Sequence, residues 1–315
     1  MQVLTLKEKI TSHALDLGFS YCGIAKAKPL VDEAEWLSAY LERKPAGVFD
    51  WLSSTFAMRL DPRQIMADAK SIIVLLLNYY APAISQDGQR FIIARYAYGK
   101  DYHIVIREKL DKLVSAIKTE AGEVRTKTFV DSGPVLEKAW AQHSGAGWIG
   151  KNTLLINKSA GSFFFIGILL TNLDLAPDEP EQDHCGSCTK CLEACPTGAL
   201  EKPYMLNPGK CISYWTIESK DAVPKELKNK FHDRIYGCDI CQDACPYNKF
   251  AIPNNEPAFV ISDEVKKMRK EDWLALTEDE FNRIFRVSPL IRTGYTKVMR
   301  TVRILWHASE TRANF

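Results

Sequence analysis

The chain has 315 residues, of which 46% are hydrophobic and 25% charged, a composition that supports a large core in a globular protein. Its net charge is only +2, so the composition as a whole does not indicate a nucleic-acid-binding protein. No apolar run reaches the ~20 residues of a membrane-spanning helix. The first residues lack the apolar centre and the cleavage site of a signal peptide. We therefore expect a cytoplasmic protein that does not span a membrane.

The first predicted elements are two helices and a strand. Apolar residues at helical spacing predict a helix over residues 5–18, which Gly18 ends. The nearly continuous apolar run 71–79 predicts a buried strand, of the kind found in sheets that are covered on both faces. A second helix is expected over residues 102–118.

A group of shorter elements follows around a turn. Residues 126–130 are expected to form a strand, and the sequence Asp-Ser-Gly-Pro at 131–134 is typical of a turn. Pro134 can then occupy the first turn of a helix over residues 135–143. Two more strands are expected at residues 153–157 and 162–171. Up to about residue 175 the pattern is that of a mixed α/β or α+β domain.

The glycine-rich segment 143–152 matches G-x-G-x-x-G and nearly matches the phosphate-binding loop G-x4-G-K-[ST], with Asn152 in the last place. Both motifs should follow a strand and open a helix, whereas here a helix comes before and a strand after. A nicotinamide-binding domain or an ATPase is therefore not favoured. The glycines would instead let the backbone approach a flat ligand, with Lys151 and Asn152 as donors at its edge.

Eight of the nine cysteines lie between Cys185 and Cys245, and only Cys22 stands apart. Disulfides are disfavoured in reducing cytosol, so such clustering indicates metal binding or catalysis. Cys22 lies in an apolar setting and is predicted to be a buried core thiol. The acidic, proline-containing segment 174–183 is typical of a linker before the cysteine-rich part.

The cysteine spacing is that of a ferredoxin with two [4Fe-4S] clusters. The pattern C-x2-C-x2-C-x3-C-P begins at Cys185, and in two-cluster ferredoxins its fourth cysteine ligates the other cluster. An incomplete copy, C-x2-C-x3-C-P, begins at Cys238, and Cys211 can supply the missing thiolate. We assign Cys185, Cys188, Cys191 and Cys245 to cluster 1, and Cys195, Cys211, Cys238 and Cys241 to cluster 2. Zinc is the alternative, but the crossed spacing and both Cys-Pro endings favour iron–sulfur.

The last part of the chain is helical in pattern and increasingly basic. Residues 281–315 hold seven basic residues and one acid, Glu310. The basic residues are Arg283, Arg286, Arg292, Lys297, Arg300, Arg303 and Arg312. Such a segment is suited to hold a polyanion such as RNA, and it equally suits a solvated helix face; the sequence leaves both open.

Seven motifs occur in order between about residues 50 and 250. They are RYAYGKDYH at 95–103, FVDSGPVLE at 129–137, GWIGKNTLL at 147–155, DHCGSC at 183–188, CPTGA at 195–199, CISY at 211–214 and GCDxCQ at 237–242. Together they resemble the epoxyqueuosine reductases, the cobalamin-dependent enzymes that complete queuosine in tRNA.

The resemblance implies three parts: a cobalamin-binding α/β domain (1–175), a two-cluster ferredoxin-like domain (176–254) and a short, basic, helical segment (255–315). Cobalamin would lie between the first two, in the base-off form. The implied reaction is reductive removal of the epoxide oxygen at the wobble position, giving queuosine, with electrons passing from an external donor through the clusters to cobalamin. The implied partner is the anticodon stem–loop of tRNA, and a monomer is expected. Many members continue into a helical-repeat domain, for which little room follows residue 280.

The resemblance assigns Asp131 the role of proton donor, because opening an epoxide leaves an alkoxide that a nearby acid must protonate. Burial beside an apolar macrocycle would favour a protonated carboxyl. The alternative is a turn-forming or helix-capping aspartate. The residues expected to bind cobalamin are Tyr96, Tyr98, His103, Asp131, Lys151, Asn152 and Tyr214. The chain has no D-x-H-x-x-G motif, so no histidine of that motif is expected to replace the lower base.

Two other functions fit parts of the pattern. One is a cobalamin and iron–sulfur reductase of a small molecule, similar to the reductive dehalogenases; the basic tail and the lack of a twin-arginine signal disfavour it. The other is an electron-transfer ferredoxin with an appended domain. The large α/β region, with Asp131 at a strand end, disfavours that one.

Overall fold

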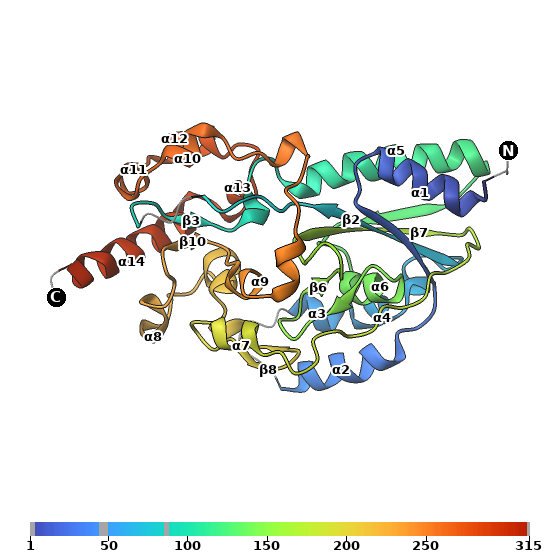
Figure 1. Ribbon diagram of the computed structural model, residues 1–315, viewed down its shortest axis with the longest axis horizontal. Helices are drawn as coiled ribbons and strands as arrows, with labels where there is room; N and C mark the ends of the chain where they lie inside the picture. Colours follow the sequence, from blue (N-terminus) through green and yellow to red (C-terminus); the bar gives the residue numbers. More distant parts are fainter. Residues whose placement is uncertain (1–3, 44–49, 85–87, 314–315) are drawn as a thin grey trace.

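The structure is a computed structural model that describes residues 4–43, 50–84 and 88–313. A four-stranded sheet lies at the centre of the N-terminal half (Figure 1), in the order β1-β2-β7-β4. The strands are β1 (Tyr21–Lys26), β2 (Ser71–Asn78), β4 (Thr126–Phe129) and β7 (Phe164–Thr171). Every neighbouring pair is antiparallel, so of the two expected classes the domain is α+β.

Helices cover both faces of this sheet (Figure 1). On one face α1 (Leu6–Asp16) and α5 (Tyr102–Ala121) pack on the odd-numbered residues of β2, and on the other α6 (Glu137–His143) packs on the even-numbered ones. Successive side chains of a strand point to opposite faces, so a strand covered on both sides needs apolar residues throughout. This explains the continuous apolar run and confirms the predicted buried strand.

The remaining elements of the first half are short. They are α2 (Val31–Glu42), α3 (Asp50–Ser54), α4 (Phe56–Leu60), η1 (Pro62–Gln64), β3 (Ile92–Ile93), η2 (Arg95–Ala97), β5 (Trp148–Ile149) and β6 (Leu155–Ile156). Two differences from the predictions bear on the site. The strand expected at 153–157 is reduced to β6, which pairs with β5 as a hairpin. Helix α6 begins at Glu137 with Leu136 as N-cap, so Pro134 does not lie in its first turn.

The later start of α6 has a structural cause. Arg59, a buried side chain of α4, donates hydrogen bonds to the carbonyl oxygens of Gly133 and Val135. In a helix that began at Val135, the carbonyl of that residue would accept from the main chain four residues on. The chain from Val130 to Leu136 is therefore a loop, held by α4.

The cysteine-rich part and the C-terminal part contain mostly short elements. They are α7 (Lys190–Ala194), β8 (Leu200–Lys202), β9 (Met205–Leu206), η3 (Pro208–Lys210), η4 (Tyr214–Glu218), α8 (Lys225–Lys228), β10 (Arg234–Tyr236), α9 (Ile240–Asp243), η5 (Pro246–Phe250), η6 (Pro257–Phe259), α10 (Asp263–Lys267), α11 (Lys270–Ala275), α12 (Glu278–Ile284), α13 (Leu290–Thr293) and α14 (Tyr295–Ala313). The segment 174–183 contains no helix or strand, and Asp178 bonds the main chain of β1 at Ile24, so its role as a linker stays a prediction. Among the described residues, no helix is both long and apolar enough to cross a membrane.

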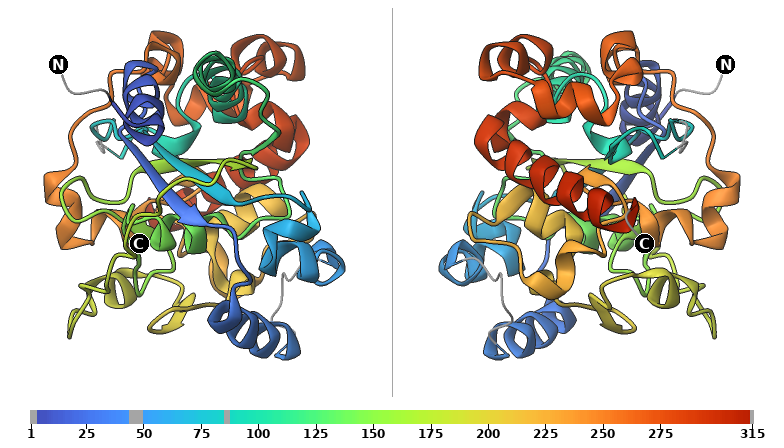
Figure 2. Two further views of the ribbon diagram at one scale, coloured as in Figure 1. Left: turned by 90° about the vertical axis from the view of Figure 1, so that its right-hand side faces the viewer. Right: turned by 90° about the vertical axis from the view of Figure 1, so that its left-hand side faces the viewer.

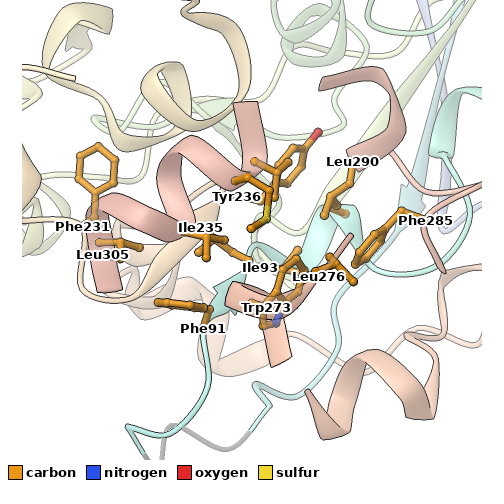
Figure 3. Close-up of a cluster of buried hydrophobic side chains, with 14 of the residues drawn as sticks. Phe91, Ile93, Phe231, Ile235, Tyr236, Trp273, Leu276, Phe285, Leu290 and Leu305 are labelled. Carbon is orange, nitrogen blue, oxygen red and sulfur yellow. The ribbon is translucent and has the colours of Figure 1, made fainter. Parts of the chain in front are cut away.

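A second large core joins these parts to the N-terminal half (Figure 3). Strand β10 pairs in parallel with β3, and Phe91 and Ile93 pack among Phe231, Ile235 and Trp273. Helix α14, drawn in red across one face in Figure 2, packs its apolar side into the same core. The chain from residue 91 to the start of α5 therefore runs between the two cores, which brings the 95–103 motif close to the cysteine-rich part.

Candidate active site and cluster sites

Four of the clustered cysteines line one cavity, namely Cys185, Cys188, Cys191 and Cys245. These are the four that the spacing assigns to cluster 1. The indole N–H of Trp148 donates to Cys185 Sγ at 3.4 Å. Lys151 Nζ donates to the carbonyl oxygens of Gly186 and Cys188 at 2.5 and 3.0 Å, so the lysine fixes the loop that carries these thiols.

The other four cysteines also lie close together. Burial raises the pKa of Cys241 well above its usual value, and the neighbouring thiols of Cys238, Cys211 and Cys195 raise it further. Burial likewise raises the pKa of Cys245 in the first set, and Cys185 and Cys188 add to that effect. Thiols that oppose each other's ionisation in this way lose their protons readily only when a bound cation compensates the charge. Both sets are therefore suited to hold metal.

A zinc ion and an iron–sulfur cluster place different demands on four thiolates. Zinc draws four thiolates to about 2.3 Å from one point, whereas an iron–sulfur cluster is surrounded by its thiolates. The four thiols of the first set line one cavity, an arrangement that is compatible with a cluster.

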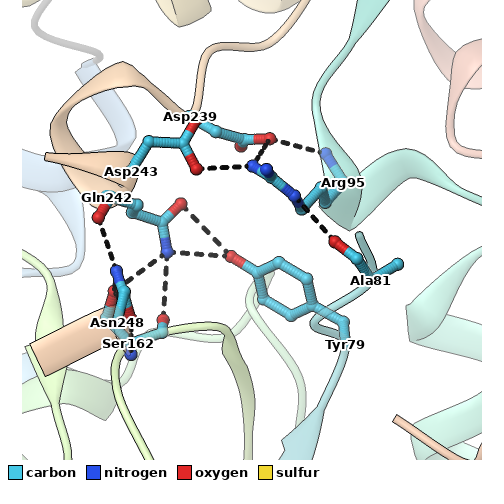
Figure 4. Close-up of polar contacts among 8 residues, drawn as sticks. All are labelled: Tyr79, Ala81, Arg95, Ser162, Asp239, Gln242, Asp243 and Asn248. Atoms are coloured by element: carbon cyan, nitrogen blue, oxygen red, sulfur yellow. Dashed lines mark hydrogen bonds and ion pairs between the residues drawn. The ribbon is translucent and has the colours of Figure 1, made fainter. Parts of the chain in front are cut away.

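A buried network ties the second set to the N-terminal half (Figure 4). The Arg95 guanidinium lies 3.1 Å from Asp239 and 2.8 Å from Asp243, and the Arg95 amide donates to Asp239 Oδ2 at 2.9 Å. Further bonds join Gln242, Tyr79, Ser162 and Asn248. Because Asp239 lies between Cys238 and Cys241 in the chain, these bonds fix the second cysteine loop relative to the sheet.

Asp131 lies directly after β4, beside the beginning of α5. Tyr102 Oη donates to Asp131 Oδ2 at 2.5 Å, and His103 Nε2 lies 3.5 Å from the same oxygen. The Asp131 side chain is 62% exposed, and its backbone has a φ of +58°. Its carboxylate does not cap α6, since Leu136 is the N-cap of that helix. Asp131 therefore contacts polar side chains of α5 and does not act as the cap of α6.

His103 is held from behind by two charged residues. Its Nδ1 lies 2.8 Å from Asp101 Oδ1, and Asp101 also caps α5 by accepting from the His103 amide at 3.0 Å. Arg292, from α13, places Nη1 2.8 Å from His103 Nδ1 and 3.1 Å from Nε2. Both ring nitrogens therefore face protein groups, which orients the imidazole toward Asp131.

Two neighbouring carboxyl groups have opposite pKa shifts. Partial desolvation by the surrounding protein acts to raise the pKa of Asp131, although its side chain is largely exposed, but hydrogen bonds from His103 and Tyr102 outweigh this and hold that pKa below its usual value. Burial, together with the charge of Asp131, raises the pKa of Glu137 to about 8. The expectation that burial beside a bound macrocycle keeps Asp131 protonated stays a prediction. Glu137 is the carboxyl group that carries a proton at neutral pH.

The raised pKa of Glu137 predicts a pH-dependent stability. Its stabilising contribution is fully present below the usual value of 4.5 and is lost as the pH rises through about 8. We expect Glu137→Gln, which cannot ionise, to have a higher free energy of unfolding than wild type at pH 9, by about 2 kcal/mol, and a similar one at pH 5. Thermal unfolding across this range measures it. A difference in Tm that does not change with pH would contradict the prediction.

Lys138 links this site to the second cysteine set. Burial lowers its pKa, and the charges of Asp131, Glu137 and Cys241 oppose that shift. The lysine therefore lies within electrostatic reach of the candidate proton donor and of a predicted cluster ligand. Its ammonium donates to the Thr153 carbonyl at 2.7 Å. The candidate active site and the second cysteine set consequently share one region of the molecule.

Two of the tyrosines predicted to bind cobalamin lie in different surroundings. Tyr96 packs against Tyr102 and Tyr236, with ring centroids 6.2 and 6.0 Å apart, so it lies next to the Asp131 site. Tyr98 is buried and lines a separate cavity with Arg95. The geometry therefore brings Tyr96, but not Tyr98, close to the candidate proton donor.

The other predicted cobalamin residues lie at the cysteine loops. Asn152 Nδ2 donates to the Cys241 carbonyl at 3.4 Å, and the backbone N–H of Tyr214 bonds the Cys211 thiol. Lys151 bonds the first cysteine loop, as described above. The donors of Lys151 and Asn152 are thus directed at protein carbonyls, and the role of these three residues in binding cobalamin stays a prediction.

The glycine-rich segment forms the turn into the β5–β6 hairpin. A helix, α6, comes before it and a strand, β6, follows, as the sequence predicted, while β5 lies within the segment itself. A Cβ atom on Gly147 would lie 2.2 Å from the Ile156 carbonyl oxygen, so only glycine allows the two strands to come this close. Gly147 therefore packs closely against the main chain of β6.

Most of the basic residues near the C-terminus are engaged with protein. Arg283 pairs with Glu264 at 2.6 Å, and Arg292 lies at His103. Lys297 and Arg300 donate to main-chain carbonyls within and just after η4. Arg312 lies outside the described side chains. Among the tail residues whose side chains the structure describes, Arg292 reaches the candidate active site.

Sequence reasoning missed several residues of this site. They are Asp101, Tyr102, Glu137 and Arg292. The first three lie inside the motifs at 95–103 and 129–137. Their closeness in the chain to His103 and Asp131 was therefore the available signal. Arg292 carried no local signal. The predicted core thiol, Cys22, packs partly buried against the first core, and burial raises its pKa to about 12.

Comparison with known proteins identifies two domains. Residues 59–132 match the family described as epoxyqueuosine reductase QueG, and residues 184–248 match a 4Fe-4S double cluster binding domain. The epoxyqueuosine reductase of Cellulophaga algicola is 46% identical over 306 residues, which are 96% of this chain and 100% of that protein.

Solved structures agree with this match. A crystal structure of an epoxyqueuosine reductase with an epoxyqueuosine-modified tRNA stem loop has a TM-score of 0.87 and 32% identity. The Bacillus subtilis epoxyqueuosine reductase, in a form with its catalytic loop swung out of the active site, has a TM-score of 0.86 and 32% identity. Each match covers 95% of this chain and 80% of the other. The chain therefore carries a double 4Fe-4S domain and belongs to the epoxyqueuosine reductase family.

Proposed function

We propose that this protein, an oxidoreductase of that family, reduces epoxyqueuosine to queuosine at the wobble position of tRNA. The observation that carries the proposal is the Asp131 carboxyl group, which Tyr102 and His103 hold with an exposed face beside the second cysteine set. A related reductase with a modified tRNA stem loop supports an RNA-borne substrate. The small-molecule reductase is not favoured, since relatives matched over nearly the whole chain are epoxyqueuosine reductases.

Electrons would reach the site through the two clusters. An external donor would reduce one cluster, and clusters of this type move one electron at a time. The proposed ligands are Cys185, Cys188, Cys191 and Cys245 for cluster 1, and Cys195, Cys211, Cys238 and Cys241 for cluster 2. The second set is the one whose charge acts on Lys138 beside Asp131, so cluster 2 would be the one that delivers electrons to the active site.

We propose that base-off cobalamin binds on the side of the site where the Asp131 carboxyl group is exposed. The Asp131 side chain is 62% exposed there, and Lys138 interacts electrostatically with both Asp131 and Cys241. When bound, cobalamin would supply a strongly reducing cobalt centre that delivers electrons to the epoxide. The residues proposed to line its pocket are Tyr96, Tyr98, His103, Asp131, Lys151, Asn152 and Tyr214. His103 would act from the side of Asp131, since its ring nitrogens face Asp101, Arg292 and Asp131.

The side chains around Asp131 would handle the protons. Removing the epoxide oxygen as water takes two electrons and two protons, and the departing oxygen needs an acid within hydrogen-bond reach. Asp131 would donate the first proton. His103, which lies between Asp101 and Asp131, is placed to return it. The Bacillus subtilis reductase has a catalytic loop that can leave the active site, and we propose residues 130–136 as the corresponding loop here.

An anaerobic turnover assay tests the proposal. The protein, with both clusters reconstituted, is incubated with a strong reductant, cobalamin and tRNA that carries epoxyqueuosine, and the nucleosides are analysed by mass spectrometry. We expect the modified nucleoside to lose one oxygen atom only when cobalamin is present. Unchanged nucleoside, in a sample with both clusters and cobalamin shown to be bound, would contradict the proposed reaction.

A further inference from the structure

The loop that carries Asp131 is held on two sides by side chains that bond its main chain. On one side, the Asp131 amide donates to Glu137 Oε1 at 2.5 Å. On the other, Arg59 Nη2 donates to the Gly133 carbonyl at 3.3 Å and Nη1 to the Val135 carbonyl at 3.4 Å. Bonds to main-chain atoms fix the course of the loop itself, and with it the direction in which the Asp131 carboxyl group points.

The loop has a conformation that needs such support. The Ser132 amide donates to the Val130 carbonyl at 2.6 Å, which closes a three-residue turn around Asp131. With the central φ at +58°, this is the rarer and more strained form of the γ-turn. Strain of this kind persists only where the surroundings determine the conformation.

Arg59 is an unusual residue to find under a loop. It is 7% exposed, and burial lowers its pKa, an effect that the neighbouring Glu137 opposes. Burying an arginine is unfavourable unless its donors are satisfied, and here they meet Thr55 and two loop carbonyls. Arg59 and Glu137 therefore bond the same loop from its two sides. One does so through a buried guanidinium group and the other through a carboxyl group.

We propose that Glu137 and Arg59 are positioning residues, which together clamp the loop 130–136 so that Asp131 points into the active site. The inference rests on the proposed function, in which Asp131 is the proton donor. Neither residue touches the substrate in this account. Each acts through the main chain of the loop.

Hydrogen–deuterium exchange of the loop tests the clamp without turnover. The proteins are wild type, Glu137→Gln and Glu137→Leu. Glutamine keeps a carbonyl oxygen in the place of Oε1, and because Glu137 is mostly protonated at neutral pH it also matches the charge. Leucine removes the acceptor. We expect exchange at the Asp131 amide to rise at least tenfold in Glu137→Leu and less than threefold in Glu137→Gln, with the amides of β2 unchanged.

The kinetic result should follow the same order. In Glu137→Leu we expect kcat to fall by 10-fold or more with the KM for tRNA unchanged, and Glu137→Gln should restore most of the rate. A fall in kcat with no change in loop exchange would overturn the clamp, as would Glu137→Gln that exchanges as fast as Glu137→Leu. If Asp131→Asn kept full activity, the proton-donor role would fail, yet the exchange data would still decide whether the clamp exists.

Arg59→Met tests the other side of the clamp. This variant decides between the outcomes if Glu137→Leu also speeds amide exchange in β2. We expect faster exchange at residues 133–136 in this variant. Its matched control is Arg63→Met, because Arg63 is a neighbouring arginine that bonds Asp61. Equal loop exchange in Arg59→Met, Arg63→Met and wild type would overturn the proposal.

Discussion

Replacing Asp131 with Asn is expected to lower kcat for epoxyqueuosine reduction by about 10²–10⁴-fold, the range that a positioned general acid contributes. Asparagine has the same size and keeps an oxygen that can accept from Tyr102, so the loop should stay in place. It cannot, however, give a proton to an alkoxide. The loss should therefore appear in the chemical step. Single-turnover kinetics with reduced protein and excess tRNA measure that step directly.

Two controls separate proton donation from binding. Cobalamin absorbance and the affinity for the RNA stem loop should be the same in Asp131→Asn and in wild type. Asp111→Asn makes the same substitution on the exposed side of α5 and should leave kcat unchanged. If Asp131→Asn kept half or more of the wild-type rate while binding both ligands, another group would have to be the acid, and Glu137 would be the first to examine because its pKa is about 8.

The parts of the fold that the sequence predicted correctly are those set by local pattern. The run 71–79 is apolar throughout because β2 is covered on both faces, and that requirement is visible in the residues themselves. The cysteine spacing is equally local, since a few residues between thiolates decide whether they can surround one cluster. Strand β1 was missed, because only three of its six residues are buried and it contains a glycine and a lysine.

The parts that could not be predicted depend on residues far away in the chain. The start of α6 moved by two residues because Arg59 bonds the carbonyls of Gly133 and Val135. The pKa of Asp131 falls below its usual value because Tyr102 and His103 meet it there, and neither contact follows from a turn motif.

The basic tail shows the same limit. Its composition allowed RNA contact or a solvated face. The structure instead directs Lys297 and Arg300 to carbonyl groups about 80 residues earlier in the chain. Arg292 differs from these residues, because the packing of α13 beside α5 brings it to His103. Nothing in the sequence distinguishes Arg292 from the other basic residues of the tail.

The crossed ligand sets predict an unequal effect of two double substitutions. Cys185→Ala with Cys245→Ala removes two ligands of cluster 1, although these residues come from the two different cysteine runs. We expect the iron content to fall from about eight to about four atoms per chain, because cluster 2 keeps all its ligands. Cys185→Ala with Cys195→Ala takes one ligand from each cluster, although both residues come from the first run. Both clusters should then be damaged, and little of either cluster's wild-type signal should remain.

Iron analysis and electron paramagnetic resonance of the reduced proteins distinguish the two double variants. If each run instead held its own cluster, the pattern would reverse, and the pair within the first run would spare one cluster. Cys22→Ala is the control for a cysteine outside the module and should keep both clusters, since Cys22 packs against the first core. Neither double variant should reduce epoxyqueuosine, because an electron from the external donor must cross both clusters. An intact cluster 2 in the first variant, without turnover, would show that this cluster alone cannot accept electrons from that donor.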